Sequence, residues 1–492
     1  MTDQEPLTEE TLDPSDWESI RALGHQMVDD MLDYTKATKE RPVWQHIPDE
    51  VKAYFGSPLP LEPQSPDEVY EEFRSCVLPY PIGNIHPRFW GWVIGTGTIY
   101  GALAEFLAAT MNTNTGGLDN HVANHVEKQV LDWLKEMLGF PATASGLLTS
   151  GCSAANLIGL AVARNVKAGF DLRREGLGGA ARQMVLYASE QSHSSIQKAI
   201  ELLGLGSDAL RLLPVNGSFQ IDTRALQAAI EQDRQVGRLP FCVVGAAGTT
   251  NTGAMDDLDA LADICAEQDL WLHVDGAFGA WAALAPGTRD LVAGMERADS
   301  LAFDLHKWMY MPYEIGCVLV QQEQAHRRTF SLTPDYLAHG DGEGGLAGGD
   351  LPWFSDYGFE LSRGFRALKA WMSLKKHGAL KYGRLIQQNV DQARYLAKLV
   401  EDAPELELVA PVMLNVVCFR YVLDSLDDAT LNQVNKQIVV ALQERGIAVP
   451  SGTAIDNKYV LHVANTNHRS RREDFDVLVR ETIRIGNEKA PT

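Results

Sequence analysis

The stretch that decides the fold is Asp299-Ser-Leu-Ala-Phe-Asp-Leu-His-Lys-Trp-Met-Tyr-Met-Pro-Tyr-Glu-Ile-Gly-Cys-Val-Leu-Val320. One apolar run, Ser300 to Phe303, ends at Asp304, and a second begins at Ile315. This pattern places Lys307 on a turn between two buried strands. An amine in such a partly dry site has its charged form disfavoured, so it can act as a nucleophile that forms a Schiff base. The alternative is a lysine that snorkels to the surface at a strand end.

A second strand with an acidic end lies upstream. The segment Leu270-Trp-Leu-His-Val-Asp275 is apolar until its last residue, and Gly276 follows it. A buried aspartate needs a cationic partner. A strand that ends in Asp, followed by one that leads into Lys, suits a pyridoxal phosphate (PLP) site, in which Asp275 pairs with the pyridinium nitrogen and Lys307 holds the aldehyde. Asp275 could instead be a helix cap or a buried turn acid.

Two further segments carry residues that suit a phosphorylated ring. Thr149-Ser-Gly-Cys-Ser-Ala-Ala-Asn156 opens a segment with helical apolar spacing. Small residues at a helix start let backbone N–H groups approach an anion, which makes Gly151, Cys152 and Ser153 candidates for a phosphate cradle. His193 lies between a strand-like run and a helical one, where it could lie flat on a cofactor ring or be purely structural.

With these motifs the chain resembles the group II PLP-dependent decarboxylases, which include aromatic-L-amino-acid, histidine, glutamate and cysteine-sulfinate decarboxylases. The resemblance runs from about His86 to His468 and covers most of the chain. It is carried by His86-Pro-Arg-Phe-Trp-Gly-Trp92, Ser189-Glu-Gln-Ser-His-Ser-Ser195, Gly248-Thr-Thr250, His273-Val-Asp-Gly-Ala277, His306-Lys-Trp308 and Leu361-Ser-Arg-Gly-Phe-Arg-Ala-Leu-Lys369.

The resemblance implies a role for each matching residue. Lys307 would be the Schiff-base lysine and Asp275 the partner of the pyridinium nitrogen. His193 would stack on the ring, with Ala277 on the opposite face and Thr250 beside the cofactor.

The phosphate side departs from the family pattern. His306 would be a phosphate-side ligand, and Gly151, Cys152 and Ser153 would form the phosphate turn. Asp304, however, stands where many relatives carry Asn. An acid beside a phosphate is unfavourable unless it is paired or faces away, so Asp304 is not expected to be a ligand.

The implied reaction is decarboxylation of an L-amino acid to the amine and carbon dioxide, through a substrate Schiff base and a carbanion that must be protonated. The glycine-rich run Gly340 to Gly349 suggests a mobile loop over the site. Tyr336 stands where relatives carry the tyrosine that supplies the proton, although it could be a packing residue. Relatives that form aldehydes tend to have Phe there, so Tyr336 favours plain decarboxylation.

The substrate is less well defined by the sequence. Trp90 and Trp92 fall where aromatic-selective relatives place pocket aromatics, although both could be core of a strand-like run, Phe89 to Ile94. The segment Met111-Asn-Thr-Asn-Thr115 resembles the glutamate and cysteine-sulfinate branch instead. We favour an aromatic substrate, with an acidic amino acid as the alternative. Aldehyde-forming or aminotransferase activity, and a non-enzymatic binding protein, are further hypotheses.

Three polar residues are candidates to bind the substrate carboxylate. Arginine matches a carboxylate with two parallel hydrogen bonds, which makes Arg363 a candidate, although a surface ion pair would also explain it. The others, His462 and Asn465, lie in or next to a C-terminal strand-like run.

The chain divides into three parts. Residues 1–85 contain a helical pattern from Trp17 to Tyr34 and a proline-rich stretch, which predicts a helical arm that packs on a partner subunit. Residues 86–380 alternate strand-like and helical runs, which predicts a large α/β domain with a mainly parallel sheet. Residues 381–492 predict a smaller α+β domain. The family resemblance implies PLP fold type I, a seven-stranded-type sheet, and a homodimer with its active site at the interface.

Composition narrows the class of protein. A net charge of −22 argues against nucleic acid or an anionic membrane as partner. Six cysteines without a C-x-x-C pair predict reduced thiols in a cytoplasmic protein. We found no signal peptide, no membrane-spanning stretch and no zinc-ligand spacing, so no metal is expected. The sequence therefore predicts a lyase of amino-acid, and hence carboxylic-acid, metabolism.

Overall fold

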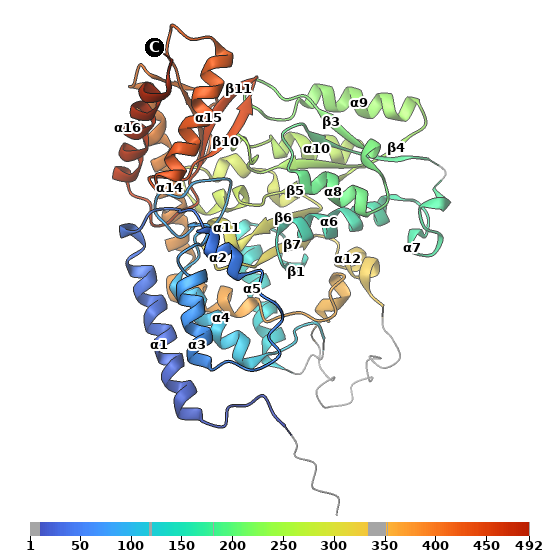
Figure 1. Ribbon diagram of the computed structural model, residues 1–492. Coiled ribbons are helices and arrows are strands. Elements are labelled where there is room, and N and C mark those ends of the chain that lie inside the picture. Colours follow the sequence, from blue (N-terminus) through green and yellow to red (C-terminus); the bar gives the residue numbers. More distant parts are fainter. Residues whose placement is uncertain (1–9, 118–120, 181, 333–350, 352, 492) are drawn as a thin grey trace, which may run out of the picture.

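The computed structural model describes residues 10–117, 121–180, 182–332, 351 and 353–491. A large sheet lies at the centre, helices cover both of its faces, and a smaller sheet lies at the C-terminal end (Figure 1). The strands of the large sheet are β1 (Ser145–Thr149), β2 (Met184–Ser189), β3 (Leu210–Leu213), β4 (Leu239–Ala246), β5 (Trp271–Asp275), β6 (Ser300–Asp304) and β7 (Gly316–Val320).

The large sheet is mainly parallel, which confirms the predicted fold class. Its seven strands have the order β1-β7-β6-β5-β4-β2-β3. Strand β7 runs antiparallel to both of its neighbours, and the other adjacent pairs are parallel. The apolar runs expected as strands at Leu270–Asp275, at Ser300–Phe303 and from Ile315 form β5, β6 and β7, whereas the sequence reading missed β1 and β3.

Helices surround this sheet on both sides. The longer ones are α1 (Trp17–Lys36), α4 (Ile99–Met111), α5 (Val122–Leu138), α6 (Cys152–Lys167), α8 (Ser194–Leu202), α9 (Thr223–Gln235), α10 (Leu258–Glu267), α12 (Glu323–Phe330), α13 (Ala367–His377), α14 (Ala379–Glu401), α15 (Asp428–Glu444) and α16 (Arg472–Lys489). Shorter ones are α2 (Asp49–Tyr54), α3 (Pro66–Glu72), α7 (Leu172–Glu175) and α11 (Leu305–Trp308). None of the helices in the described ranges is long and apolar enough to cross a membrane.

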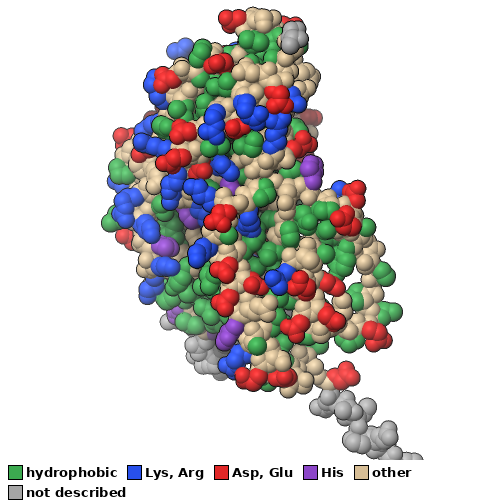
Figure 2. Space-filling view, turned by 60° about the vertical axis from the view of Figure 1, so that its left-hand side comes forward, with side chains coloured by type: hydrophobic (Ala, Val, Ile, Leu, Met, Phe, Trp, Pro, Cys, Tyr) green, Lys and Arg blue, Asp and Glu red, His purple; other side chains and the backbone are tan. Residues whose placement is uncertain are grey.

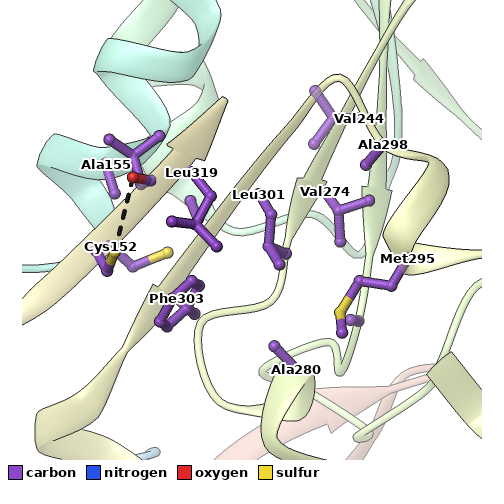
Figure 3. Close-up of a cluster of buried hydrophobic side chains, with 14 of the residues drawn as sticks. Cys152, Ala155, Val244, Val274, Ala280, Met295, Ala298, Leu301, Phe303 and Leu319 are labelled. Carbon is purple, nitrogen blue, oxygen red and sulfur yellow. Dashed lines mark hydrogen bonds between the residues drawn. The ribbon is translucent and has the colours of Figure 1, made fainter. Parts of the chain in front are cut away.

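Strand alternation decides which helix covers which face. A Cβ added to Gly159 of α6 would lie 2.7 Å from the ring of His273, whereas one added to Gly245 of β4 would meet Leu258 of α10 and Leu272. Because Leu272 and His273 are consecutive in β5, they point to opposite faces, and so α6 and α10 lie on opposite sides of the sheet. Figure 3 shows buried side chains of β4 to β7 in one hydrophobic cluster with Cys152 and Ala155 of α6 and with Ala280, Met295 and Ala298.

The smaller sheet is antiparallel, with the order β10-β11-β9-β8. Its strands are β8 (Leu406–Leu408), β9 (Val416–Tyr421), β10 (Ser451–Ile455) and β11 (Lys458–Ala464). A separate hydrophobic cluster under this sheet includes Leu396 and Val400 of α14. The proposed boundary at residues 380/381 falls at the start of that helix, and the three-part division stays a prediction.

Residues 89–94 do not form the expected strand. Phe89 makes one isolated bridge to Val449, and Trp90 donates its backbone N–H to the Val449 carbonyl. These contacts attach the segment to the chain just before β10, where it pairs for too short a length to count as a strand.

A close approach of two backbones shapes the end of β6. The strand ends at Asp304, the short helix α11 follows, and β7 returns beside β6 with Asp304 opposite Gly316. A Cβ on Gly316 would lie 2.6 Å from the Cα of Gly151 and 2.8 Å from the Asp304 carboxylate. Only a residue without a side chain lets the N-terminus of α6 lie across these strand ends.

We expect Gly316→Ala to destabilise the protein by about 1–3 kcal/mol, because the new methyl group meets backbone that cannot rotate away. Thermal unfolding followed by circular dichroism measures this loss. Gly364→Ala is the matched control, since a Cβ there has nothing within 4 Å. Equal melting temperatures for the two variants would contradict the predicted crowding.

Candidate active site

Lys307 lies on α11, directly after the buried end of β6. Its Nζ is 3.2 Å from Oδ2 of Asp304, and the side chain is 20% exposed. Burial alone lowers the pKa of Lys307, but the nearby Asp304 and Asp275 carboxylates outweigh it and raise the pKa above its usual value. The expectation that a dry site would disfavour the charged amine is therefore wrong for the cofactor-free chain, because the sequence reading did not include Asp304 as its partner.

Asp304 occupies the N-terminus of α6. Its Oδ1 accepts the backbone N–H of Cys152 at 2.6 Å, and the residue is 2% exposed. Asp304 thus takes one of the free N–H groups that a helix start offers to an anion. The acid is paired, as the sequence reading required of an acid at this position.

His306 lies beside Asp304 on the phosphate side. Its Nδ1 accepts the backbone N–H of Ile315 at 3.1 Å, and its Nε2 is 3.6 Å from Asp304 Oδ2. Burial lowers the pKa of His306, so the ring is neutral near pH 7 and carries its proton on Nε2. The other expected members of this side, Gly151 and Ser153, lie at the start of α6, where Ser153 is exposed.

Asp275 ends β5 and is 8% exposed. Its Oδ1 accepts the backbone N–H of Ala277 at 3.1 Å and the thiol of Cys152 at 3.4 Å. Its Oδ2 accepts the side-chain amide of Asn156 at 3.0 Å. Cys152 therefore connects the two acids, since its thiol contacts Asp275 and its N–H contacts Asp304.

His193 is the N-cap of α8 and is exposed. Nδ1 lies 2.8 Å from the Ser195 hydroxyl and accepts the Ser195 backbone N–H at 3.2 Å. The surrounding protein lowers the pKa of His193 by desolvation, while the charge of Asp275 acts in the opposite direction. The ring is therefore neutral near pH 7.

Thr250 and Trp92 belong to one chain of hydrogen bonds. The Trp92 backbone N–H donates to Ser451 Oγ at 2.9 Å, and Ser451 Oγ contacts His462 Nδ1 at 2.9 Å. His462 Nε2 then donates to the Thr250 carbonyl at 2.8 Å. Burial lowers the pKa of His462, which keeps it neutral, as this pattern requires. Trp92 itself has φ +55° and is 50% exposed, an uncommon backbone conformation for a bulky residue.

Several residues expected to bind substrate have other contacts instead. Trp90 is 1% exposed, stacks on Phe475 and donates to Ser470, so it belongs to the smaller hydrophobic core. Arg363 is fully buried against Glu127, and its guanidinium also donates to the carbonyls of Thr115 and Leu148. Both predictions are wrong, because these polar groups are used inside the protein. The alternative of a surface ion pair for Arg363 is also wrong, since that pair is internal.

The C-terminal candidates are also internal. His462 is 2% exposed, with both ring nitrogens engaged by Ser451 and Thr250. Asn465 is fully buried and donates to the Asn389 carbonyl and the Gln392 side chain. Neither one is free to bind a substrate carboxylate.

Sequence reasoning gave no role to Asn156 or His273, although both lay inside quoted motifs. Cys152 and Asn156 are four residues apart on α6 and so share a helical face. His273 and Asp275 are two apart on β5 and so share a sheet face. These two spacings are the sequence features from which the meeting of Cys152, Asn156, His273 and Asp275 could have been predicted. Tyr336 and the glycine-rich run lie outside the described residues.

Known proteins that are similar to this chain identify its family. The model of the pyridoxal-dependent decarboxylase conserved domain matches residues 48–422. The chain is 35% identical over 461 residues to an aromatic-L-amino-acid decarboxylase of Bacillus atrophaeus, and the match covers 93% of each chain. It is 29% identical to a phenylacetaldehyde synthase of Arabidopsis thaliana, over 92% of this chain and 93% of that one.

A solved structure shows the same fold. The crystal structure of Oryza sativa TDC with PLP and tryptamine has a TM-score of 0.89 and 26% identity, and the match covers 97% of this chain and 99% of that one. The site and fold define a PLP-dependent enzyme of the α/β type. The chain belongs to the pyridoxal-dependent decarboxylase family and is a PLP-dependent amino-acid decarboxylase.

The residues present fit PLP by their donor chemistry. Lys307 offers a primary amine to the aldehyde, and Asp275 offers a buried carboxylate to the pyridine nitrogen. His193 offers an exposed aromatic side chain to the ring, and the start of α6 offers backbone N–H groups to the phosphate. Asp304 alone opposes the fit, because its charge shares the helix start with the incoming anion.

We expect Asp304→Asn to tighten PLP binding by about tenfold, equivalent to about 1.4 kcal/mol, because it removes a like charge beside the phosphate. The amide oxygen can still accept the Cys152 N–H. Titration of the resolved apoenzyme with PLP measures the affinity. Asp299→Asn, just before the same strand, is the matched control, since Asp299 accepts the Leu272 N–H away from the site. Unchanged or weaker binding in Asp304→Asn would contradict the predicted repulsion.

Proposed function

We propose that the enzyme decarboxylates an aromatic L-amino acid to its amine and carbon dioxide. The observation that carries the aromatic substrate is Trp92, a half-exposed residue with a left-handed backbone, whose backbone N–H begins a series of hydrogen bonds that leads to Thr250. Strain of this kind at an exposed aromatic residue is typical of functional sites. The Bacillus atrophaeus relative, named as an aromatic-L-amino-acid decarboxylase, supports the same class of substrate.

In this proposal each site residue has one task. Lys307 holds the cofactor aldehyde, and Asp275 keeps the pyridine nitrogen protonated. His193 and Ala277 contact the two ring faces, with Thr250 beside the ring. Bound PLP supplies an electron sink for the pair left on the substrate's alpha carbon.

The phosphate group has its own ligands in this proposal. His306, Ser153 and the backbone of Gly151 and Cys152 hold it at the start of α6. Backbone N–H groups carry most of this binding, because Cys152 has a thiol where a hydroxyl would donate more strongly.

A further task is protonation of the alpha carbon. We assign it to Tyr336, on the basis of its place in the family pattern. A hydroxyl at that place would deliver a proton to the alpha carbon before oxygen can react there. The phenylacetaldehyde synthase among the relatives makes aldehyde formation the specific alternative.

The active site is proposed to lie at the interface of a cytoplasmic homodimer. Helix α1 exposes large apolar side chains, namely Trp17, Ile20, Met27, Val28 and Leu32. Figure 2, which brings the side of the molecule with α1 forward, shows hydrophobic and charged side chains mixed on that face. An amphipathic helix of this kind suits packing on a partner subunit. The six free cysteines suit a reducing compartment.

The proposal predicts that aromatic amino acids give carbon dioxide and amine in equal amounts. A panel of Tyr, Dopa, Trp, 5-hydroxy-Trp, Phe, His, Glu, Asp and cysteine sulfinate measures both products. Preference for Glu, Asp or cysteine sulfinate would replace the aromatic assignment by the acidic one. Borohydride reduction followed by peptide mapping checks that the trapped cofactor is on Lys307.

Tyr336→Phe should shift the products from amine towards aldehyde and hydrogen peroxide, because the proton donor to the alpha carbon is lost. Product analysis under air and under nitrogen measures the shift, since oxidation requires oxygen. Tyr313→Phe is the matched control. Its hydroxyl accepts the Gly95 N–H, and its ring packs beside the ring of His306. If Tyr336→Phe keeps the amine as its main product, the proton comes from another group.

A further inference from the structure

Asn156 lies between two residues that are assigned to opposite parts of the cofactor. It is fully buried on α6, and its amide nitrogen is 3.0 Å from Asp275 Oδ2 and 3.1 Å from Ser195 Oγ. Ser195 in turn contacts His193. The Asn156 amide therefore links Asp275, assigned to the pyridine nitrogen, through Ser195 to His193, assigned to a face of the ring.

The direction of each hydrogen bond follows from the carboxylate. An ionised Asp275 only accepts, so Asn156 must turn its NH₂ group towards Asp275 and its oxygen towards His273. His273 Nε2 lies 2.9 Å from that oxygen and must donate. Burial lowers the pKa of His273 to about 4, so the ring is neutral and its Nδ1 must accept.

The hydrogen bonds beyond His273 agree with this assignment. His273 Nδ1 is 2.8 Å from the Ser300 hydroxyl, which therefore donates to it. Ser300 Oγ accepts the indole N–H of Trp271 at 2.8 Å, and an indole N–H can only donate. This series of hydrogen bonds thus begins with a donor at Trp271 and ends with an acceptor at Asp275. Every bond between them has a single consistent direction.

The hydrogen bonds from Asn156 through Ser195 orient His193. The other hydrogen of the Asn156 amide donates to Ser195 Oγ, so the Ser195 hydroxyl is left to donate to His193 Nδ1. The Ser195 backbone N–H points at the same nitrogen. His193 therefore carries its proton on Nε2.

We propose that Asn156 is a positioning residue that couples the two cofactor-contacting groups: one amide holds Asp275 in place and sets the tautomer of His193. The inference deepens the proposed function and rests on it for the roles of Asp275 and His193. Asn156 itself is fully buried, so it acts through the side chains that it contacts. Substitution of Asn156 should therefore have two separate effects. One is on PLP binding, through Asp275, and the other is on the pKa and tautomer of His193, through Ser195.

The effect on His193 is tested in cofactor-free enzyme by ¹⁵N NMR of labelled histidines, with His193 assigned through His193→Gln. In Asn156→Asp the introduced carboxyl cannot donate to Ser195, so the Ser195 hydroxyl turns towards it and leaves His193 Nδ1. The pKa of His193 should rise by about one unit, and protonation at Nδ1 should become detectable. Ser195→Ala should have the same effect, because it removes that donor directly.

Other titratable groups lie near Asn156, Ser195 and His193 and could also affect the pKa of His193. They are Cys152 on α6, His273 and Asp275 on β5, Asp304 on β6, Lys307 on α11 and Lys198 on α8. They are common to Asn156→Asp and Ser195→Ala, and only the first variant adds a charge. A shift present in both variants therefore reports the lost hydroxyl donor.

The effect on PLP binding is tested by PLP titration of the resolved apoenzyme. Asn156→Leu keeps the size of the side chain but removes the donor to Asp275, and it should weaken PLP binding by about tenfold. Ser195→Ala should leave the affinity within about twofold, because Asp275 keeps its three donors. Asn165→Asp and Asn165→Leu are matched controls on α6, where the Asn165 side chain accepts from Arg164 and makes no other hydrogen bond to a residue that the structure describes.

Three outcomes overturn the inference. They are a His193 resonance that does not move in Asn156→Asp, a PLP affinity that is unchanged in Asn156→Leu, and equal effects in the Asn165 controls. Melting temperatures of all variants separate these outcomes from loss of folding. Neither readout uses an amino-acid substrate, so an error in the substrate assignment leaves this test intact.

Discussion

The carboxylates of Asp275 and Asp304 end neighbouring strands, β5 and β6, in a place that water hardly reaches. A buried carboxylate is costly unless donors or cations surround it. Both find their donors on the first turns of α6, and Asp304 also faces Lys307. The helix therefore has to lie across the strand ends, and its position determines where the amine, the acid and the helix start meet.

This requirement explains features that are otherwise unrelated. Gly159 and Gly316 leave room for α6 to approach the sheet, where a methyl group would meet His273 or the backbone of Gly151. The site also concentrates negative charge around a single amine, which keeps Lys307 protonated while the cofactor is absent. In the proposed cofactor site, Asp304 would have a phosphate's negative charge beside it, whereas Asp275 would pair with a pyridinium, so the two acids would respond to the cofactor in opposite senses.

The strands that carry the site could be predicted from the sequence because they are short apolar runs with a polar residue at the end. β1 and β3 were missed. β3 is a four-residue edge strand whose burial is incomplete, and the apolar part of β1 is only a few residues long. The buried roles of Trp90, Arg363 and His462 could not be read either, since their partners lie far away in the chain, at Phe475, Glu127 and Thr250. Sequence motifs identify which residue types gather at a site, whereas only the folded chain shows which of them are already engaged.

The hydrogen bonds from Trp92 through Ser451 and His462 to Thr250 have a consequence for how such a protein can be rearranged. They join the segment before α4, the smaller sheet and the loop after β4, three parts that are distant in sequence. The C-terminal region thus holds Trp92 and Thr250 in position. A chimera that exchanges this region between relatives would need Ser451 and His462 to come with it. Without them, a correctly folded hybrid would still leave the Thr250 carbonyl and the Trp92 backbone without their partners.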